Sequence, residues 1–234
     1  MLPEIKHPIL KLVLPSNGKT ISYRPYTVRE EKLFLTARMS EDFEEAVDTL
    51  LQVLKNCILT EDVKVDDLPM FDIEWLFMNL RKNSVSNVVE LFYDDEGTKI
   101  PFKIDLADVT VYKDPKHSTK LKLTEGVYAS MRYPNLRDIL KLEAAVTAPV
   151  AEFNDLVFEM FLNNVEAIYD DDKKYDQFTK EELSKLILSL PLNSMEEVRQ
   201  FFETMPVILL KTTVKTPSGP KEVTLRGLRD FFTF

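Results

Sequence analysis

The stretch from Thr27 to Leu59 constrains the fold most, because it combines a helix-start signal with a long apolar periodicity. Thr27 and Glu30 have the spacing of a capping box, and Ser40 can begin a second helix. Apolar residues recur three or four positions apart, as on one face of a helix. They are Phe43, Val47, Leu50, Leu51, Leu54 and Ile58. The stretch therefore predicts a helix pair over residues 28–38 and 41–58.

This apolar face has two interpretations that the sequence leaves open. It either packs in the core of the protein or lines a groove that receives a partner. The pattern itself specifies no chemistry. The aromatic tail has the same two interpretations, because Phe231, Phe232 and Phe234 either dock within the chain or anchor a partner.

The charge balance argues against nucleic acid as a partner. The chain of 234 residues has a formal net charge of −9, and binding to phosphate backbones needs clustered Lys or Arg. There is no apolar run of about 18 residues, so no membrane span is expected. Residues 1–13 also lack the apolar core of a signal peptide. These features predict a protein that is assembled in cytoplasm.

Residues 1–134 have the pattern of an α+β part. Asn17-Gly18 lies between two β-like runs and predicts a hairpin. Apolar spacing around Trp75 predicts a helix over residues 70–81. Segments in which apolar and polar residues alternate then predict a second hairpin, a short strand and a third β pair. Those segments are 84–93 with 99–106, 109–112, and 120–124 with 127–133.

From residue 135 onwards the apolar spacing is helical. It predicts helices over residues 136–146 and 149–168. Two further capping boxes, beginning at Thr179 and Ser194, each predict another helix. An extended segment over residues 207–214 follows, then a turn at 216–220 and a segment at 222–225 that can pair back with the first. A short helix over residues 225–232 is expected at the end.

The predicted fold class is α+β. It comprises an N-terminal hairpin and helix pair, a central small antiparallel sheet and a mostly helical C-terminal half. The expected division is into residues 1–134 and 135–234. Because the segment joining them is short, a single shared core is the alternative.

The sequence contains no catalytic constellation. It lacks the P-loop, dinucleotide-binding, nucleophile-elbow and zinc-protease motifs. His7, His117 and Cys57 are its whole supply of His and Cys, so a zinc site is not expected. Acidic clusters at residues 94–96 and 170–172 are interpreted as solvated turns. We therefore predict no catalytic residue, no metal and no cofactor.

Four segments in order along the chain carry a family resemblance. The first runs from LPSNGK at residues 14–19 into YRPYTVREEK at residues 23–32. The others are FDIEWL with LRKNS within residues 71–84, MRYP at 131–134 and LRGLRDFF at 225–232. Together they resemble the T4-like bacteriophage baseplate hub proteins and hub assembly proteins. Some relatives carry cysteine pairs near the central hairpin. This chain has none there, so a metal staple is not carried over.

The resemblance implies a non-enzymatic chaperone that helps to build the baseplate hub of a contractile phage tail. Its partners would be other hub proteins, the tape-measure protein or both, and an oligomer is compatible with this role. It would act in the host cell cytoplasm, and in the virion if it stays in the baseplate. The alternatives are a permanent structural subunit of the hub and, from another class, an uncharacterised enzyme or a regulatory binding module. The residues expected at a partner surface are Phe43, Val47, Leu50, Leu54, Phe231, Phe232 and Phe234.

Overall fold

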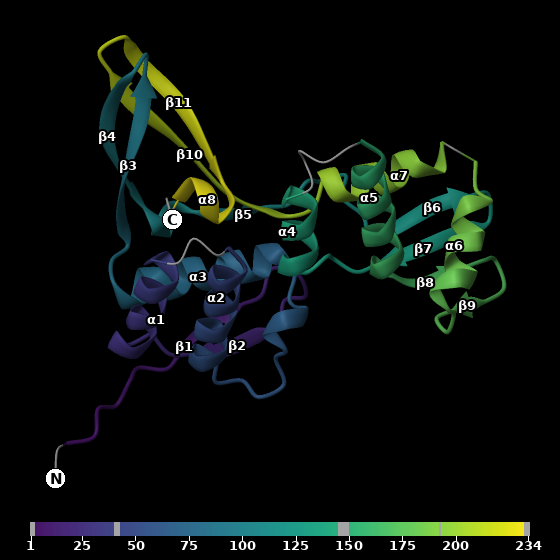
Figure 1. Ribbon diagram of the computed structural model, residues 1–234, viewed down its shortest axis with the longest axis horizontal. Coiled ribbons are helices and arrows are strands. Elements are labelled where there is room, and N and C mark those ends of the chain that lie inside the picture. Colours follow the sequence, from purple (N-terminus) through teal and green to yellow (C-terminus); the bar gives the residue numbers. More distant parts are fainter. Residues whose placement is uncertain (1–2, 40–42, 145–149, 192, 232–234) are drawn as a thin grey trace. The chain divides into compact units, whose positions relative to one another are not determined.

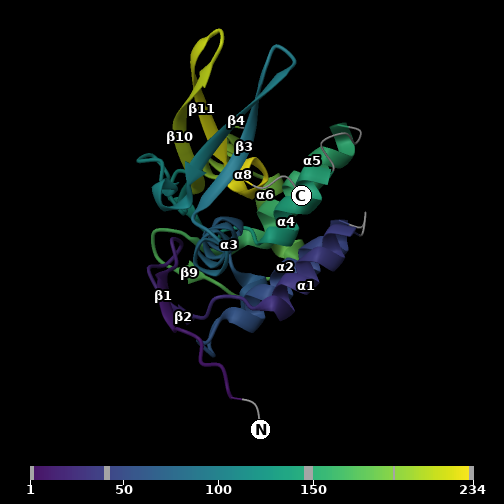
Figure 2. The same ribbon diagram turned by 90° about the vertical axis from the view of Figure 1, so that its left-hand side faces the viewer.

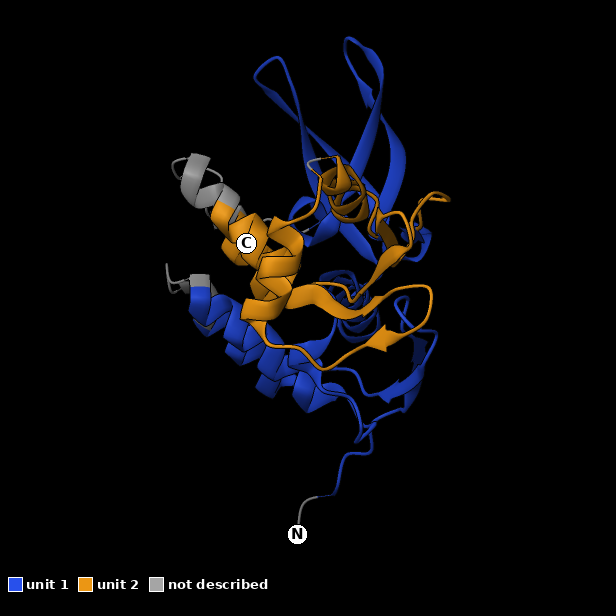
Figure 3. Ribbon diagram, turned by 90° about the vertical axis from the view of Figure 1, so that its right-hand side faces the viewer, with its two compact units in different colours: residues 1–112, 206–234 blue, residues 113–205 orange. Residues whose placement is uncertain are grey.

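The computed structural model describes residues 3–39, 43–144, 150–191 and 193–231 (Figure 1). The chain forms two compact units, coloured separately in Figure 3. Unit 1 comprises residues 1–112 and 206–234, and unit 2 comprises residues 113–205. Unit 2 is therefore inserted between two parts of unit 1. The expected division into residues 1–134 and 135–234, with a single shared core as its alternative, stays a prediction.

Unit 1 begins with the predicted hairpin and helix pair. The elements are β1 (Leu10–Val13), β2 (Thr20–Tyr23), α1 (Val28–Met39) and α2 (Phe43–Cys57). The two strands pair antiparallel, with Leu12 opposite Ile21. Gly18 lies in the turn with a φ of 73°, a conformation that glycine adopts without strain. These elements confirm the sequence prediction for this part of the chain.

A buried helix, α3 (Met70–Ser84), forms the centre of unit 1. A short 3-10 helix, η1 (Val65–Asp67), precedes it. Ile73, Leu76 and Leu80 on α3 are completely buried. The carboxylate of Asp72 is buried as well, and it accepts a hydrogen bond from the backbone N–H of Ser16 at 3.0 Å. This contact joins the first turn of α3 to the β1–β2 turn.

Two long hairpins complete unit 1, and both extend from its helices in the same direction (Figures 1 and 2). The elements are β3 (Val88–Asp95), β4 (Thr98–Asp105), η2 (Leu106–Asp108), β5 (Thr110–Tyr112), β10 (Val207–Thr216), β11 (Gly219–Arg226) and α8 (Gly227–Phe231). Strands β3 and β4 form one sheet, and the other has the order β11-β10-β5. Leu91, Ile104, Leu210, Leu225 and Phe231 belong to the core cluster that the hairpins share.

Unit 2 is built around a four-stranded antiparallel sheet of order β6-β7-β8-β9. Its elements are β6 (Lys120–Thr124), β7 (Val127–Met131), α4 (Leu136–Ala144), α5 (Val150–Asn164), β8 (Val165–Tyr169), β9 (Lys174–Tyr175), α6 (Lys180–Leu188) and α7 (Ser194–Glu203). Its core includes Leu123, Met131, Phe161, Leu183 and Phe201.

The predicted fold class is wrong in its account of the second half. Residues 135–234 are not a mostly helical half, because β8, β9, β10 and β11 lie in them. The described chain contains eight α-helices and eleven strands in four sheets, rather than one hairpin and one small central sheet. The longest of these strands, β10, pairs with β5 from before the insertion. Pairing of this kind across a long sequence separation leaves no local signal.

Two smaller predictions in unit 2 are also wrong. Val165 and Ile168 continue the helical spacing of α5, but they belong to strand β8. Ser194 does not cap α7, because its hydroxyl donates a hydrogen bond to the carbonyl of Leu123 in β6. The capping box at Thr179 is confirmed, with reciprocal bonds between Thr179 and Glu182.

Candidate partner-binding surfaces

The residues predicted to bind a partner differ in how deeply the structure buries them. Val47 and Leu54 are buried on the inner side of α2, and Leu50 is half-buried. Phe231 is completely buried in the hairpin core cluster. Phe232, Phe234 and the side chain of Phe43 lie outside the described residues. A role of these residues in binding a partner stays a prediction.

The exposed apolar side chains of the helix pair lie on α1. Val28 is 74% exposed and Leu35 is 53% exposed. They are seven positions apart, so they project from one side of the helix. Phe34 packs edge-on against Phe77 of α3, with ring centroids 5.6 Å apart. Helix α1 is therefore anchored through Phe34. It leaves two apolar residues exposed, Val28 and Leu35, which are called the apolar strip below and lie on either side of the charged residues Glu31 and Lys32.

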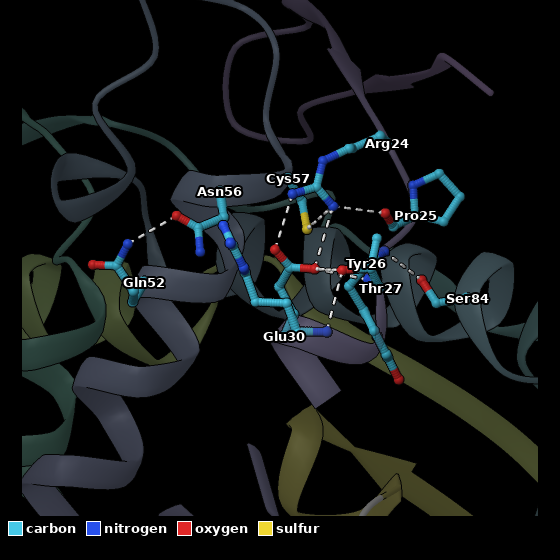
Figure 4. A network of polar contacts seen from close by, with 10 residues as sticks. Arg24, Pro25, Tyr26, Thr27, Glu30, Gln52, Asn56, Cys57 and Ser84 are labelled. Atoms are coloured by element: carbon cyan, nitrogen blue, oxygen red, sulfur yellow. Dashed lines mark hydrogen bonds and ion pairs between the residues drawn. The ribbon is translucent and has the colours of Figure 1, made fainter. Parts of the chain in front are cut away.

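A buried polar network fixes the start of α1 (Figure 4). Glu30 is 1% exposed, and its Oε1 accepts a hydrogen bond from Arg24 Nη2 at 2.9 Å. Its Oε2 accepts from the backbone N–H of Thr27 at 2.7 Å and from the Thr27 hydroxyl at 2.5 Å. Glu30 thus reaches back as the capping box predicts, whereas the Thr27 hydroxyl donates to Glu30.

The network shifts the pKa values of its members in opposite directions. Burial alone would raise the pKa of Glu30, but hydrogen bonds from Arg24 and Thr27 hold it at about 2. Burial raises the pKa of Cys57 to about 11, although Arg24 opposes this shift. The Cys57 thiol is therefore protonated near neutral pH and fully buried, which suits a packing role.

The two hairpins carry the longest exposed strand surfaces of unit 1. On the outer face of β3, Phe92 is 63% exposed and lies between the exposed residues Glu90 and Asp94. On the outer face of β10, the exposed residues are Lys211, Thr213 and Lys215. The cluster shared by the inner faces supports both hairpins.

The two hairpins contact each other at their turns and leave a hollow between them nearer the helices. The Ser218 hydroxyl lies 2.9 Å from both carboxylate oxygens of Asp95, so the two turns are joined. This hydrogen bond lowers the pKa of Asp95. Nearer the helices, an open hollow of about 440 Å³ separates β4 from β10. Lys103, Asp105, Thr110 and Lys211 are among its lining residues.

In unit 2, the half-buried His117 has a polar partner at each ring nitrogen. His117 Nδ1 lies 2.9 Å from Thr204 Oγ1, and Nε2 lies 2.9 Å from the Tyr133 hydroxyl. Thr204 already donates its hydroxyl hydrogen to the carbonyl of Gln200 at 2.6 Å, so it accepts from Nδ1–H. Nε2 is then the acceptor for Tyr133. Burial lowers the pKa of His117, and its ring packs on Phe201.

Other kinds of site find no support in the described part of the chain. No group of three or more His, Cys, Asp or Glu side chains there is arranged to hold a metal ion. No described helix is long and apolar enough to cross a membrane. The hairpin edges are the surface that sequence reasoning missed. Pro101 and Pro220 were the available signal, since proline within a strand marks an edge.

The comparisons with known proteins identify the family. A family model described as T4 bacteriophage base plate protein matches residues 7–233. No curated protein and no solved structure matches the chain. The match confirms the resemblance to T4-like baseplate proteins, and it places the partners of the chain among other phage tail proteins. The chain belongs to the family of T4 bacteriophage base plate proteins.

Proposed function

We propose that this chain is a non-enzymatic assembly factor for the hub of a contractile-tail baseplate. In this role it binds hub proteins, the tape-measure protein or both, and keeps them competent to assemble. The observation that carries the proposal is the family match over residues 7–233, which covers nearly the whole chain with a baseplate family. A family of baseplate proteins also favours a non-catalytic role.

The apolar strip on α1 supports binding to a helical partner. Val28 and Leu35 are exposed on one side of a helix whose other side is anchored through Phe34. A long helical protein presents apolar side chains at helical spacing, and such a protein packs against a matching strip. Burying two aliphatic side chains of this size contributes about 1.5–3 kcal/mol each.

The alternative is a permanent structural subunit of the hub, which the family description favours equally. The two functions differ in whether the chain stays in the finished particle. Quantitative mass spectrometry of purified phage particles, beside the infected-cell lysate, separates them. An assembly factor is expected in the lysate and absent from particles. A fixed ratio to known baseplate subunits in the particles would instead establish the structural alternative.

Co-expression tests the binding itself. Tagged chain is expected to capture hub or tape-measure proteins when they are produced together, and capture of neither would overturn the proposal. The double variant Val28→Asp/Leu35→Asp is expected to lose capture, because it places charges on the apolar strip. Leu188→Asp is the matched control, since Leu188 is 73% exposed on α6 of unit 2.

A further inference from the structure

The outer strand edges of the two hairpins differ in whether their backbone N–H and C=O groups are free to bond to a further strand. In an antiparallel pair, residues alternate between pairs that exchange both backbone hydrogen bonds and pairs that exchange none. Pro220 has no N–H and lies opposite Lys215, so this pair is of the second kind. By alternation, Lys211, Thr213 and Lys215 direct their N–H and C=O groups away from β11.

This edge of β10 is open over most of its length. Strand β5 pairs only with Val207–Leu209, and no other described strand pairs with β10 on that side. Beside Lys211 a hollow of about 440 Å³ lies between this edge and Lys103 of β4. Backbone groups of Lys211, Thr213 and Lys215 therefore present donors and acceptors for one more strand.

The same reasoning identifies an open edge on β3. Pro101 lies opposite Phe92, so this pair exchanges no backbone hydrogen bond. Glu90, Phe92 and Asp94 consequently direct their backbone groups away from β4. At the base of the strand, the N–H of Val88 is already satisfied by Ser86 Oγ at 3.0 Å. The open part of β3 is therefore three alternate residues, as on β10.

The two remaining edges of the hairpins are blocked in part. On β4, Pro101 removes a donor from the outer edge. On β11, Pro220 removes one donor and the N–H of Arg226 donates to Asp230 Oδ2 at 2.7 Å. Each hairpin therefore has one hindered edge and one open edge. The open edges of a single chain belong to different sheets and do not pair with each other.

The charges of the open edges are complementary. Glu90 and Asp94 lie four residues apart on β3, and Lys211 and Lys215 lie four residues apart on β10. In an antiparallel pairing, Glu90 lies opposite Lys215 and Asp94 lies opposite Lys211. Phe92 then covers Thr213. Opposite charges at directly opposed positions stabilise a sheet, and like charges destabilise it.

Self-pairing of either edge is disfavoured by the same rule. Two β10 edges would place Lys211 opposite Lys215, and two β3 edges would place Glu90 opposite Asp94. Lysine on an exposed edge commonly prevents strand pairing. Here it excludes pairing between like edges and leaves the acidic edge as a compatible partner.

We propose that the β3 edge of one copy of this chain adds to the β10 edge of a second copy, joining two hairpins into a continuous sheet. The contact is head-to-tail, so two joined copies still have one free β3 edge and one free β10 edge between them, and assembly continues until a ring closes. This inference does not rest on the proposed assembly role. Co-expression therefore tests the assembly role, self-association of the purified chain tests this inference, and either one can be overturned without the other.

The test is self-association of the purified chain, measured by sedimentation velocity and light scattering over a range of concentrations. The native chain is expected to form oligomers that weaken at high salt, because the paired charges are screened. Glu90→Lys/Asp94→Lys and Lys211→Glu/Lys215→Glu are each expected to weaken association by about tenfold or more. Mixing the two variants is expected to restore it, because acidic and basic edges then face each other again.

A proline pair tests the backbone contact apart from the charges. Thr213→Pro removes the central donor of the open β10 edge and is expected to abolish association. Thr224→Pro is the matched control, because Thr224 lies opposite Lys211 and directs its N–H to the outer edge of β11. Circular dichroism checks that both variants fold. A native chain that stays monomeric at every concentration would overturn the proposal, as would equal effects of the two prolines.

Discussion

Glu74 on α3 accepts a hydrogen bond from the backbone N–H of Leu228 at 3.0 Å, across 154 positions of sequence. Glu74 is buried, and its Oε1 lies 2.8 Å from where a Cβ on Gly227 would stand. The contact joins the central helix of unit 1 to the first turn of α8. It requires glycine at position 227 both for space and for a φ of 61°.

Gly227→Ala is therefore expected to destabilise the protein more than Gly18→Ala. Both glycines have positive φ, which costs alanine about 1–2 kcal/mol, but nothing lies within 4 Å of a Cβ at Gly18. Urea unfolding of the two variants measures the difference. Adding Glu74→Ala should remove the excess cost of Gly227→Ala, and additive effects in that double-mutant cycle would contradict the contact.

Val47→Asp is expected to unfold unit 1 or to lower its stability by on the order of 3 kcal/mol or more, because it buries a charge within the α2 core. Val28→Asp makes the same change at an exposed position and should alter stability by less than about 0.5 kcal/mol. Thermal unfolding compares the two. Near-native melting of Val47→Asp would show that this side of α2 is not core.

The Glu30 network predicts acid sensitivity below neutral pH. The pKa of Glu30 is lowered to about 2, so its ionised form stabilises the fold above its ordinary pKa near 4.5. That contribution is lost as the pH falls from about 4.5 towards 2. Native chain should exceed Glu30→Gln in stability at pH 6, by on the order of 3 kcal/mol, and the gap should narrow below pH 4.5.

An exposed ion pair serves as the control for this measurement. Lys19 and Asp62 lie at the surface, so Asp62→Asn should leave stability nearly unchanged at both pH values. A gap between native chain and Glu30→Gln that is constant from pH 6 to pH 3 would contradict the assigned pKa.

His117 predicts a second acid effect, at higher pH. Its pKa is lowered by burial from 6.5, so the unfolded chain takes up a proton before the folded chain does. Stability is therefore fully present above pH 6.5 and falls as the pH drops below it. His117→Gln should remove this dependence between pH 7 and pH 5, whereas His7→Gln, at an exposed position, should leave it unchanged. Chemical unfolding across this range provides the measurement.

Local signals account for the parts of the fold that sequence predicts. The turn at Gly18, the spacing along α2 and the capping box at Thr179 each act within a few residues. Strand β8 was assigned to a helix because Val165 and Ile168 keep the spacing of α5. A short apolar run does not by itself distinguish a buried strand from a helix.

The candidate surfaces depend on pairing that is distant in sequence. Periodicity shows that Val47 and Leu54 share a face, but it does not show that the face is buried. Lys211 and Lys215 become an open edge only because β5 begins at Thr110, opposite Leu209, and does not extend further along β10. Tyr112 and Val207 pair although all of unit 2 lies between them in the sequence. This arrangement therefore follows from tertiary structure rather than from any local motif.

The insertion of unit 2 also sets an order of events during translation. All of residues 113–205 leave the ribosome before β10 and β11 do, so unit 2 can fold while unit 1 still lacks two strands and α8. Until then the inner face of the β3–β4 hairpin, with Leu91 and Ile104, has no cover from the β10–β11 hairpin. The nascent chain therefore exposes the apolar inner face of this hairpin throughout synthesis of the insert.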